Sequence, residues 1–429
     1  MRGIRGHLAP GAVTACVVLS ACGEVEAAPD SVVVDSAGVV VVENRRAVWS
    51  AEDAWRIEHE PEVEIGGLDV APEYALYNVA SALRLADGRI LVGDRGSSEL
   101  RLYDESGVYL ESKGGPGEGP GEFGNLWTVT RYRADSLLIW DSGNVRLSVH
   151  DADGDFRRSF KLAGGEAEGT IYFPGPRLLP LEDGSVLGFE WLNPMGQPEG
   201  LFRPVLDYLR FSPTGEREEL VLRAPYQEWM LARFDPGRPM QMRGQPTAMT
   251  PLLFGRESFL SVHGGTIWVG RGRGDGYTVE GHANDGSLLR RVENRTFRPV
   301  AVEDRHVDAE IEGRLESMDA QLERMPGMAA YIKKRKETLE KLPIPEFFPP
   351  YQDLRTSVDG HVWVQAYAPP GVEPTRWSVF DPEGTLLGDV ELPRDFEVMD
   401  IGPDYVLGTF VDEYDVEHVR LHRIVRPAT

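Results

Sequence analysis

The chain has 429 residues, 69 Asp and Glu against 45 Lys and Arg, and a net charge of −24. An apolar fraction of 41% is too high for a wholly disordered chain, and two cysteines are too few for a disulfide-stabilised scaffold. The acidic balance also argues against nucleic acid as a partner, because a protein that neutralises phosphates needs a basic face.

Residues 1–21 have the pattern of a secretory signal peptide. Arg2 and Arg5 form a short basic region, an apolar stretch runs from Leu8 to Ala21, and small residues precede Cys22. The stretch is too short to cross a bilayer stably, because a spanning helix takes about 20 apolar residues. We therefore expect an exported protein.

The run Leu19-Ser20-Ala21-Cys22 resembles the bacterial lipobox. The resemblance implies a lipid on the Cys22 thiol, cleavage before Cys22, and a mature chain that the lipid holds on a membrane of the cell envelope. The alternative is an ordinary signal peptide with an incidental cysteine. Residues 22–30 then form a tether, and Gly23 in place of an Asp favours the outer membrane, facing the periplasm or the exterior.

Residues 31–425 predict a single β-propeller built from a degenerate repeat. Val79–Gly107 matches the sequence 47 positions further on at eight positions, from Leu91 and Leu138 to Gly107 and Gly154. Short apolar runs between Asp-Gly-type turns indicate four strands per unit, which is typical of a propeller blade. In the first unit these strands are expected at Ala80–Leu85, Arg89–Gly93, Glu99–Tyr103 and Val108–Ser112.

Looser copies of the unit follow around the turns at Asp183-Gly184, Gly264-Gly265 and Asp359-Gly360, which makes five units. The tail supplies two further strands, at Tyr405–Phe410 and Val416–Ile424. We expect Ser31–Val42 and Glu62–Ile65 to complete the last unit and so remove the open edges of the ring. The prediction is an all-β propeller of six blades, with seven as the alternative.

The segment 302–342 departs from the strand pattern. Val307, Ile311, Leu315, Met318 and Leu322 recur at steps of four and three, as on one face of a helix. A Pro-Gly pair at 326–327 interrupts the pattern, which then resumes to residue 339. We expect an inserted pair of helices that covers one mouth of the channel, presents a partner surface, or packs as an outer ornament.

Residues 91–107 and the run Gly115–Phe123 resemble the NHL-type repeats of bacterial six-bladed propeller lipoproteins of unassigned function. Asp35–Asn44 resembles the same group. The resemblance extends over residues 31–425 and is strongest over 79–160. It implies a fold and leaves the function open.

The candidate ligand-binding residues lie on loops that we expect at one face of the propeller. Carboxylates gathered there would suit Ca²⁺, which prefers oxygen ligands. The competing interpretation is that the aspartates stabilise turns by accepting bonds from backbone amides. The candidates are Asp94, Arg95, Glu118, Glu122, Asp141, Asn144 and Arg146.

No catalytic residue is identified. Gly119–Gly124 matches the spacing of a dinucleotide fingerprint, but the strand-like Trp127-Thr-Val-Thr follows where that motif needs a helix. Nine histidines occur without a His-Glu-x-x-His motif or paired cysteines, so the pattern signals no zinc site. A Gly-x-Ser-x-Gly nucleophile motif is also absent from the sequence.

The sequence therefore favours a lipid-anchored envelope propeller that binds a small molecule or a protein partner without catalysis. Two alternatives stay open. One is a Ca²⁺-dependent hydrolase similar to lactonases and gluconolactonases, with acidic side chains in its channel. The other is a purely structural envelope component that acts through the helical insertion.

Overall fold

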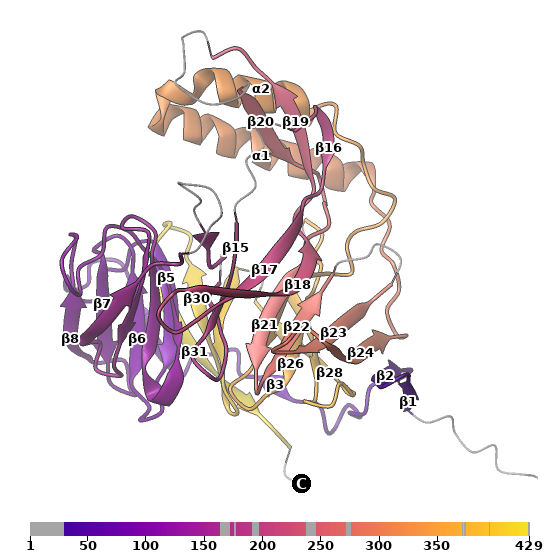
Figure 1. The fold of residues 1–429 in the computed structure, drawn as a ribbon, viewed down its shortest axis with the longest axis horizontal. Coiled ribbons are helices and arrows are strands. Elements are labelled where there is room, and N and C mark those ends of the chain that lie inside the picture. Colours follow the sequence, from indigo (N-terminus) through magenta and orange to yellow (C-terminus); the bar gives the residue numbers. More distant parts are fainter. Residues whose placement is uncertain are drawn as a thin grey trace, which may run out of the picture.

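The computed structural model describes residues 30–427 except 164–171, 176, 191–196, 237–245, 272–275, 371, 373–374 and 394. The predicted leader and Cys22 lie outside the described residues. Most described elements are β-strands in small antiparallel sheets, and two helices stand at one end of the molecule (Figure 1). Among the described residues, no helix has the length and apolarity needed to cross a membrane.

The first two sheets follow the 47-residue repeat. Both sheets have four antiparallel strands in chain order. Sheet 1 contains β5 (Val79–Arg84), β6 (Ile90–Asp94), β7 (Glu99–Tyr103) and β8 (Tyr109–Gly114). Sheet 2 contains β9 (Leu126–Arg131), β10 (Leu137–Asp141), β11 (Arg146–His150) and β12 (Phe156–Phe160), with a short 3-10 helix η1 (Arg133–Asp135) in the turn between β9 and β10.

Sheet 3 is less regular. Three strands in the connections within and after it form a separate small sheet, here named the cap sheet. Sheet 3 contains β13 (Tyr172–Phe173), β14 (Leu179–Pro180), β15 (Val186–Glu190), β17 (Val205–Phe211) and β18 (Arg217–Pro225). The cap sheet contains β16 (Gly200–Phe202), β19 (Trp229–Arg233) and β20 (Thr247–Pro251).

Sheet 4 carries the first hairpin of the chain on its outer edge. Its own strands are β21 (Phe259–His263), β22 (Thr266–Gly270), β23 (Thr278–Ala283) and β24 (Leu288–Asn294). Strand β2 (Val39–Asn44) pairs with β24 in parallel, and β1 (Ser31–Ser36) pairs with β2. The expectation that Ser31–Val42 completes the last sheet is therefore wrong, because β2 takes the free outer edge of β24 instead.

Sheets 5 and 6 complete the series. Sheet 5 contains β25 (Tyr351–Thr356), β26 (Val362–Ala366), β27 (Thr375–Phe380) and β28 (Leu386–Leu392). Sheet 6 contains β29 (Phe396–Ile401), β30 (Tyr405–Val411) and β31 (Glu417–Val425), and then β3 (Arg56–Ile57) and β4 (Val63–Gly66), which both pair with β31. The predicted closure by N-terminal strands is confirmed for the segment around residues 63–66.

The hydrophobic core lies between neighbouring sheets. Leu91 and Leu102 of sheet 1 share a buried cluster with Val129 and Ile139 of sheet 2, and five further clusters join the other consecutive sheets. One of these clusters joins sheet 6 back to sheet 1. The sheets thus form a closed β-propeller. The count of six blades, with seven as the alternative, stays a prediction that these six sheets fit.

Glycine is required where the turn of one sheet meets the backbone of the next. Gly286 follows Asp285 in a turn with φ of 84°, and a Cβ there would lie 1.8 Å from the carbonyl oxygen of Val221. Gly215 has φ of 91°, and its Cβ would lie 2.0 Å from the carbonyl oxygen of Lys161. Glycine alone adopts a positive φ without strain and, because it has no Cβ, lets the turn lie this close to the neighbouring backbone.

The helical insertion forms as predicted. Helix α1 (Asp304–Arg324) begins with a capping box between Glu303 and His306, and a 3-10 turn η3 (Pro326–Met328) separates it from α2 (Ala329–Leu339). Lys336 Nζ lies 2.5 Å from Asp319 Oδ1 and joins the two helices. In Figure 1 both helices lie beside β19 and β20 of the cap sheet.

The cap sheet and the helices leave the propeller at the same end. Strand β16 lies in the β15–β17 connection, β19 and β20 in the β18–β21 connection, and the helices in the β24–β25 connection. Because successive strands within each sheet are antiparallel, these connections all lie at one end of the ring, here named the cap end. The loop at residues 95–98 and the connector 115–125 lie at that end for the same reason.

Candidate functional site

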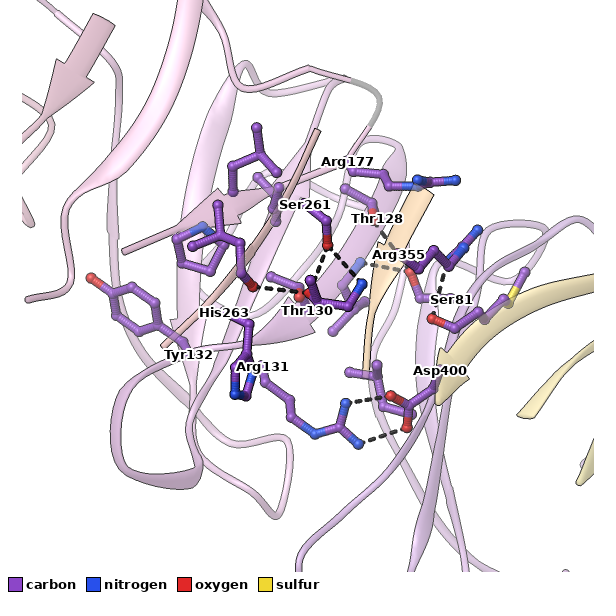
Figure 2. Close-up of a pocket in the computed structure, with 18 of the residues that line it drawn as sticks. Ser81, Thr128, Thr130, Arg131, Tyr132, Arg177, Ser261, His263, Arg355 and Asp400 are labelled. Atoms are coloured by element: carbon purple, nitrogen blue, oxygen red, sulfur yellow. Dashed lines mark hydrogen bonds and ion pairs between the residues drawn. The ribbon is translucent and has the colours of Figure 1, made fainter. Parts of the chain in front are cut away.

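A cavity of about 880 Å³ runs along the middle of the propeller. Its walls come from the innermost strand of all six sheets, namely β5, β9, β14, β21, β25 and β29. Figure 2 shows side chains from several of these strands converging on the cavity. A small-molecule site commonly has a volume of about 300–1,000 Å³, so this channel is the leading candidate site.

Two pairs of hydroxyl groups join neighbouring inner strands along the wall. Ser81 Oγ lies 3.3 Å from Thr128 Oγ1, and Ser261 Oγ lies 2.7 Å from Thr356 Oγ1. Each serine also accepts a hydrogen bond from the backbone of the next sheet: Val129 N donates to Ser81 at 2.8 Å and Thr356 N donates to Ser261 at 3.0 Å. These bonds give the channel a fixed polar surface.

An ion pair crosses one side of the channel. Arg131, the last residue of β9, donates from both terminal nitrogens to the carboxylate of Asp400 on β29, each at 2.6 Å. The Asp400 carboxylate also accepts the hydroxyl of Tyr405 at 2.7 Å and the backbone N–H of Arg84 at 3.0 Å. A bidentate guanidinium–carboxylate pair of this kind is short and directional.

A three-residue cluster crosses the other side. Arg177 Nη1 and Nη2 lie 2.6 and 2.7 Å from the two oxygens of Asp353 on β25, and Arg355 Nε donates to the same carboxylate at 3.0 Å. Arg355 Nη1 donates to the carbonyl of Met399 at 3.2 Å. In the described part of the chain, Arg355 Nη2 makes no hydrogen bond, which leaves one guanidinium nitrogen for a ligand. One carboxylate thus serves two cations.

The two buried aspartates stay ionised because of these arginines. Burial raises the pKa of Asp400, but the charge and hydrogen bonds of Arg131 outweigh burial, and the pKa lies below its ordinary value. Burial likewise raises the pKa of Asp353, while Arg177 and Arg355 lower it further than burial raises it. Burial and the neighbouring charge of Arg177 lower the pKa of Arg355. A second anion near Arg355 would relieve that repulsion.

The described lining of the channel is richer in cations than the chain as a whole. It contains five arginines and three acidic residues, whereas the full chain carries 45 basic and 69 acidic residues. Among the described ion pairs, none involves Arg95 or Arg133. The charged lining residues are Arg95, Arg131, Arg133, Arg177, Arg355, Glu182, Glu397 and Asp400.

A side chamber of about 370 Å³ adjoins the channel between sheets 5 and 6. It shares Arg177, Arg355 and Glu397 with the channel, and it adds the carboxamides of Gln352 and Gln365 and the carboxylates of Asp353 and Asp395. Its wall includes Trp377, whose side chain is 1% exposed and whose Nε1 has no hydrogen-bond partner in the described residues. Arg355 therefore lines two connected spaces that both offer hydrogen-bonding groups.

Of the residues selected from the sequence, Arg95 alone lines the channel. It lies at the cap end, where its guanidinium is 4.6 Å from the ring centre of Trp127 and donates to the carbonyls of Leu126 and Trp127 and to Asn78 Oδ1. Most of its donors are already satisfied by the protein. Arg95 therefore shapes the mouth of the channel.

Asp94 and Asp141 occupy equivalent buried positions at the ends of β6 and β10, outside the channel lining. Asp94 accepts the backbone N–H groups of Tyr77 at 3.1 Å and Ser97 at 3.0 Å. Asp141 accepts the backbone N–H of Asn125 at 3.0 Å. The turn-stabilising interpretation of these two residues therefore agrees with their hydrogen bonds. The expectation that they end inner strands near the top of the channel is wrong, because β6 and β10 are the second strands of their sheets.

Asn144, Arg146, Glu118 and Glu122 act together on the Gly-rich connector. Asn144 Nδ2 donates to Asp141 Oδ2 at 2.7 Å, and Arg146 donates to the carbonyls of Glu118 and Glu122 at 2.9 and 2.8 Å. Glu122 Oε2 in turn accepts the N–H of Gly119 at 2.8 Å. These contacts hold the connector, and none of the four residues lines the channel.

Within the described residues, no group of three or more His, Cys, Asp or Glu side chains is placed to hold a metal ion. Asp400 of the channel and Asp353 of the side chamber face arginines instead of one another. The residues that converge there, Arg131, Arg177 and Arg355, were missed by sequence reasoning because their partners lie far away in the chain. Of the three, Arg131 alone lies beside a segment that is expected from the sequence to be strand-like, Trp127-Thr-Val-Thr.

No protein-family model matches the chain, and no curated protein matches it. Solved structures with a similar chain fold include a putative exported protein from Bacteroides fragilis. It is 11% identical over 90% of this chain and 99% of that one, with a TM-score of 0.46. A member of the duf4221 family from Bacteroides vulgatus is 9% identical over 87% of this chain and 99% of that one, with a TM-score of 0.46. A gluconolactonase from Xanthomonas campestris is 13% identical over 85% and 99%, with a TM-score of 0.35.

Proposed function

We propose that this protein is an exported, lipid-anchored β-propeller of the cell envelope that binds a small polar ligand with an anionic group in its channel, without catalysis. The anchor would be Cys22, on the outer membrane, with residues 22–30 as the tether. One observation carries the ligand class: five arginines line the described channel of a strongly acidic chain.

The arginines are arranged so that a ligand anion would add to existing contacts. Asp353 is the one carboxylate within ion-pair distance of Arg177 and Arg355 in the described residues, while Glu397 acts on both arginines from farther away. A carboxylate or phosphate oxygen beside Arg355 Nη2 would add a direct charge-assisted hydrogen bond to that nitrogen. Gln352 and Gln365 offer further donors and acceptors in the adjoining chamber.

Binding is favoured over the Ca²⁺-dependent hydrolase by the chemistry of the lining. Ca²⁺ takes six to eight oxygen ligands, mostly carboxylates and carbonyls. The buried carboxylates Asp400 of the channel and Asp353 of the side chamber each accept two hydrogen bonds from the guanidinium of one arginine. Positive charge next to both groups disfavours a cation at the same place.

The experiment compares matched ligands that differ only in the charged group: D-glucuronate with D-glucose, and L-glutamate with L-glutamine. Thermal unfolding of the purified chain is measured with each compound at millimolar concentration, because a ligand that binds only the folded state raises Tm. The proposal expects a higher Tm with at least one anionic member than with its neutral partner. Equal Tm within both pairs, or stabilisation by Ca²⁺ alone, would overturn it.

A further inference from the structure

The channel and the side chamber meet at a place, here named the junction, that presents opposite charges to one shared space. Arg177, Arg355 and Glu397 are the described residues that line both spaces. Glu397 is exposed and, in the described part of the chain, makes no ion pair and no side-chain hydrogen bond. Asp353 holds both arginines instead. The junction therefore leaves the Glu397 carboxylate and the Nη2 nitrogen of Arg355 for a ligand.

The side chamber lies where sheet 5 departs from the pattern of sheet 1. Asp353, Gln365 and Trp377 oppose one another across β25, β26 and β27, so their side chains lie on one face of sheet 5. A bulge precedes Asp353 in β25, and a bulge at the same place precedes Ser81 in β5. The residue opposite Ser81 is Gly93, which is therefore the counterpart of Gln365.

In sheet 1 the space beside this position is filled by apolar side chains of sheet 2. A Cβ on Gly93 would lie 3.0 Å from Val129 Cγ2 and 3.1 Å from Leu126 Cδ2. Gln365 instead lines a space of about 370 Å³, and its carboxamide makes no hydrogen bond in the described residues. Sheet 5 thus has a cavity with a free carboxamide where sheet 1 has a packed core.

The charges of the chamber indicate which second group a ligand carries. The described lining has three carboxylates, of Asp353, Asp395 and Glu397, against two guanidinium groups. Among the described ion pairs, none involves Asp395 or Glu397. An ionised carboxylate only accepts hydrogen bonds, so a ligand group beside Glu397 has to be a donor. A primary ammonium fits best, because it brings three N–H donors and a positive charge.

We propose that the anionic ligand is an acidic α-amino acid, with its ammonium on Glu397 and its α-carboxylate on Arg355 Nη2. This inference rests on the proposed function and names the ligand class. One carbon carries both groups of an α-amino acid, which suits a carboxylate and a guanidinium that face the same space without pairing. Gln365 offers the ammonium a second acceptor. The side-chain carboxylate of the ligand lies in the channel, whose described lining has five arginines and three acidic residues.

Removal of the ammonium from the ligand tests this proposal. Calorimetric titration of the purified chain compares L-glutamate with glutarate, which has the same carbon chain and both carboxylates but no ammonium. L-aspartate and succinate form a second, shorter pair. We expect at least one of the two amino acids to bind at least about tenfold more tightly than its partner, since a charge-assisted hydrogen bond is lost in the diacid.

Two results would overturn the inference in different ways. Equal affinities within both pairs, with measurable binding of a diacid or of D-glucuronate, would overturn the amino acid as ligand and leave the proposed function standing. No binding of any of these five compounds would overturn the proposed function and this inference together.

A matched pair of variants tests the place of the ammonium. Glu397→Gln keeps the size of the side chain and removes its charge, so the preference for the amino acid over the diacid should fall at least about tenfold. Affinity for the diacid should stay the same or rise. Glu391→Gln, on an exposed residue of β28, is the control and should keep the preference. Circular dichroism checks that both variants fold. An unchanged preference in Glu397→Gln would overturn the proposed contact.

Discussion

Arg131 on β9 and Asp400 on β29 form a bidentate ion pair that crosses over the sheet between them. The same guanidinium donates to the carbonyl of Arg84 at 2.6 Å, so one side chain joins sheets 2, 1 and 6. On the other side of the channel, Arg177 and Asp353 join sheets 3 and 5 past sheet 4 in a similar way. Two such pairs stabilise a ring whose neighbouring sheets are also held by apolar clusters and by hydrogen bonds such as those of Ser81 and Ser261.

Replacing Arg131 with alanine should cost about 2–4 kcal/mol of unfolding free energy, because Asp400 would stay buried without its counter-charge. The side chain of Asp400 is 5% exposed in this pair. Urea denaturation of the purified variant measures the loss. Arg223→Ala is the control, because its pair with Asp207 is exposed and should contribute less than about 1 kcal/mol. Equal losses in both variants would contradict a bracing role for Arg131.

Acid should remove the stability that Asp400 provides. The pKa of Asp400 lies below its ordinary value, because Arg131 outweighs the opposing effect of burial. A lowered folded-state pKa stabilises the fold above the unfolded-state pKa of about 4, and this contribution is lost as the pH falls through the folded-state value. We expect the stability difference between wild type and Asp400→Asn to be constant from pH 8 to pH 6 and to shrink below about pH 4. A difference that did not change down to pH 3 would contradict this assignment.

Asp94 and Asp141 should affect stability more than binding. Alanine at Asp94 leaves the N–H groups of Tyr77 and Ser97 without their acceptor and should cost about 2–3 kcal/mol. The exposed Glu105→Ala is the control and should change stability by less than about 0.5 kcal/mol. Calorimetric titration with Ca²⁺ separates the two roles. Heat of Ca²⁺ binding that disappears in Asp94→Ala would show a metal ligand in place of a turn residue.

The proposed lipid anchor predicts different effects of replacing Cys22 and Cys16. Cys22→Ser should move the protein from the detergent phase to the aqueous phase in a Triton X-114 partition of bacterial cells and should abolish labelling with radioactive palmitate. Cys16→Ser should change neither, because Cys16 lies inside the predicted leader. Aqueous partitioning of the unaltered chain would instead indicate an ordinary signal peptide.

Local patterns in the sequence were sufficient to predict most of the strands and both helices. The expected strand Glu99–Tyr103 is observed with the same bounds, and the break at residues 326–327 separates two helices as predicted. Strand β29 was missed although Phe396 and Val398 alternate with polar residues, and the cap sheet was missed because its strands lie in connections within and after sheet 3. These errors come from how strands pair at long range.

The candidate site was less predictable than the fold. Asp94 and Asp141 stood out because they repeat at a fixed spacing, and that spacing reflects the same turn after the second strand of sheets 1 and 2. The channel residues do not repeat: Arg131 and Asp400 are 269 positions apart, and no local pattern connects them. Only closure of the ring brings such residues together, so the arginines of the channel become visible only in three dimensions.

Calorimetric titration of the best anionic compound into wild type and Arg355→Gln tests most directly whether the channel is the binding site. Arg177 keeps its two contacts with Asp353 in this variant, so the fold should survive. We predict at least a tenfold weaker affinity in Arg355→Gln, which corresponds to about 1.4 kcal/mol, and unchanged affinity in the surface control Arg223→Gln. Equal affinity in wild type and Arg355→Gln would contradict a ligand site in the channel.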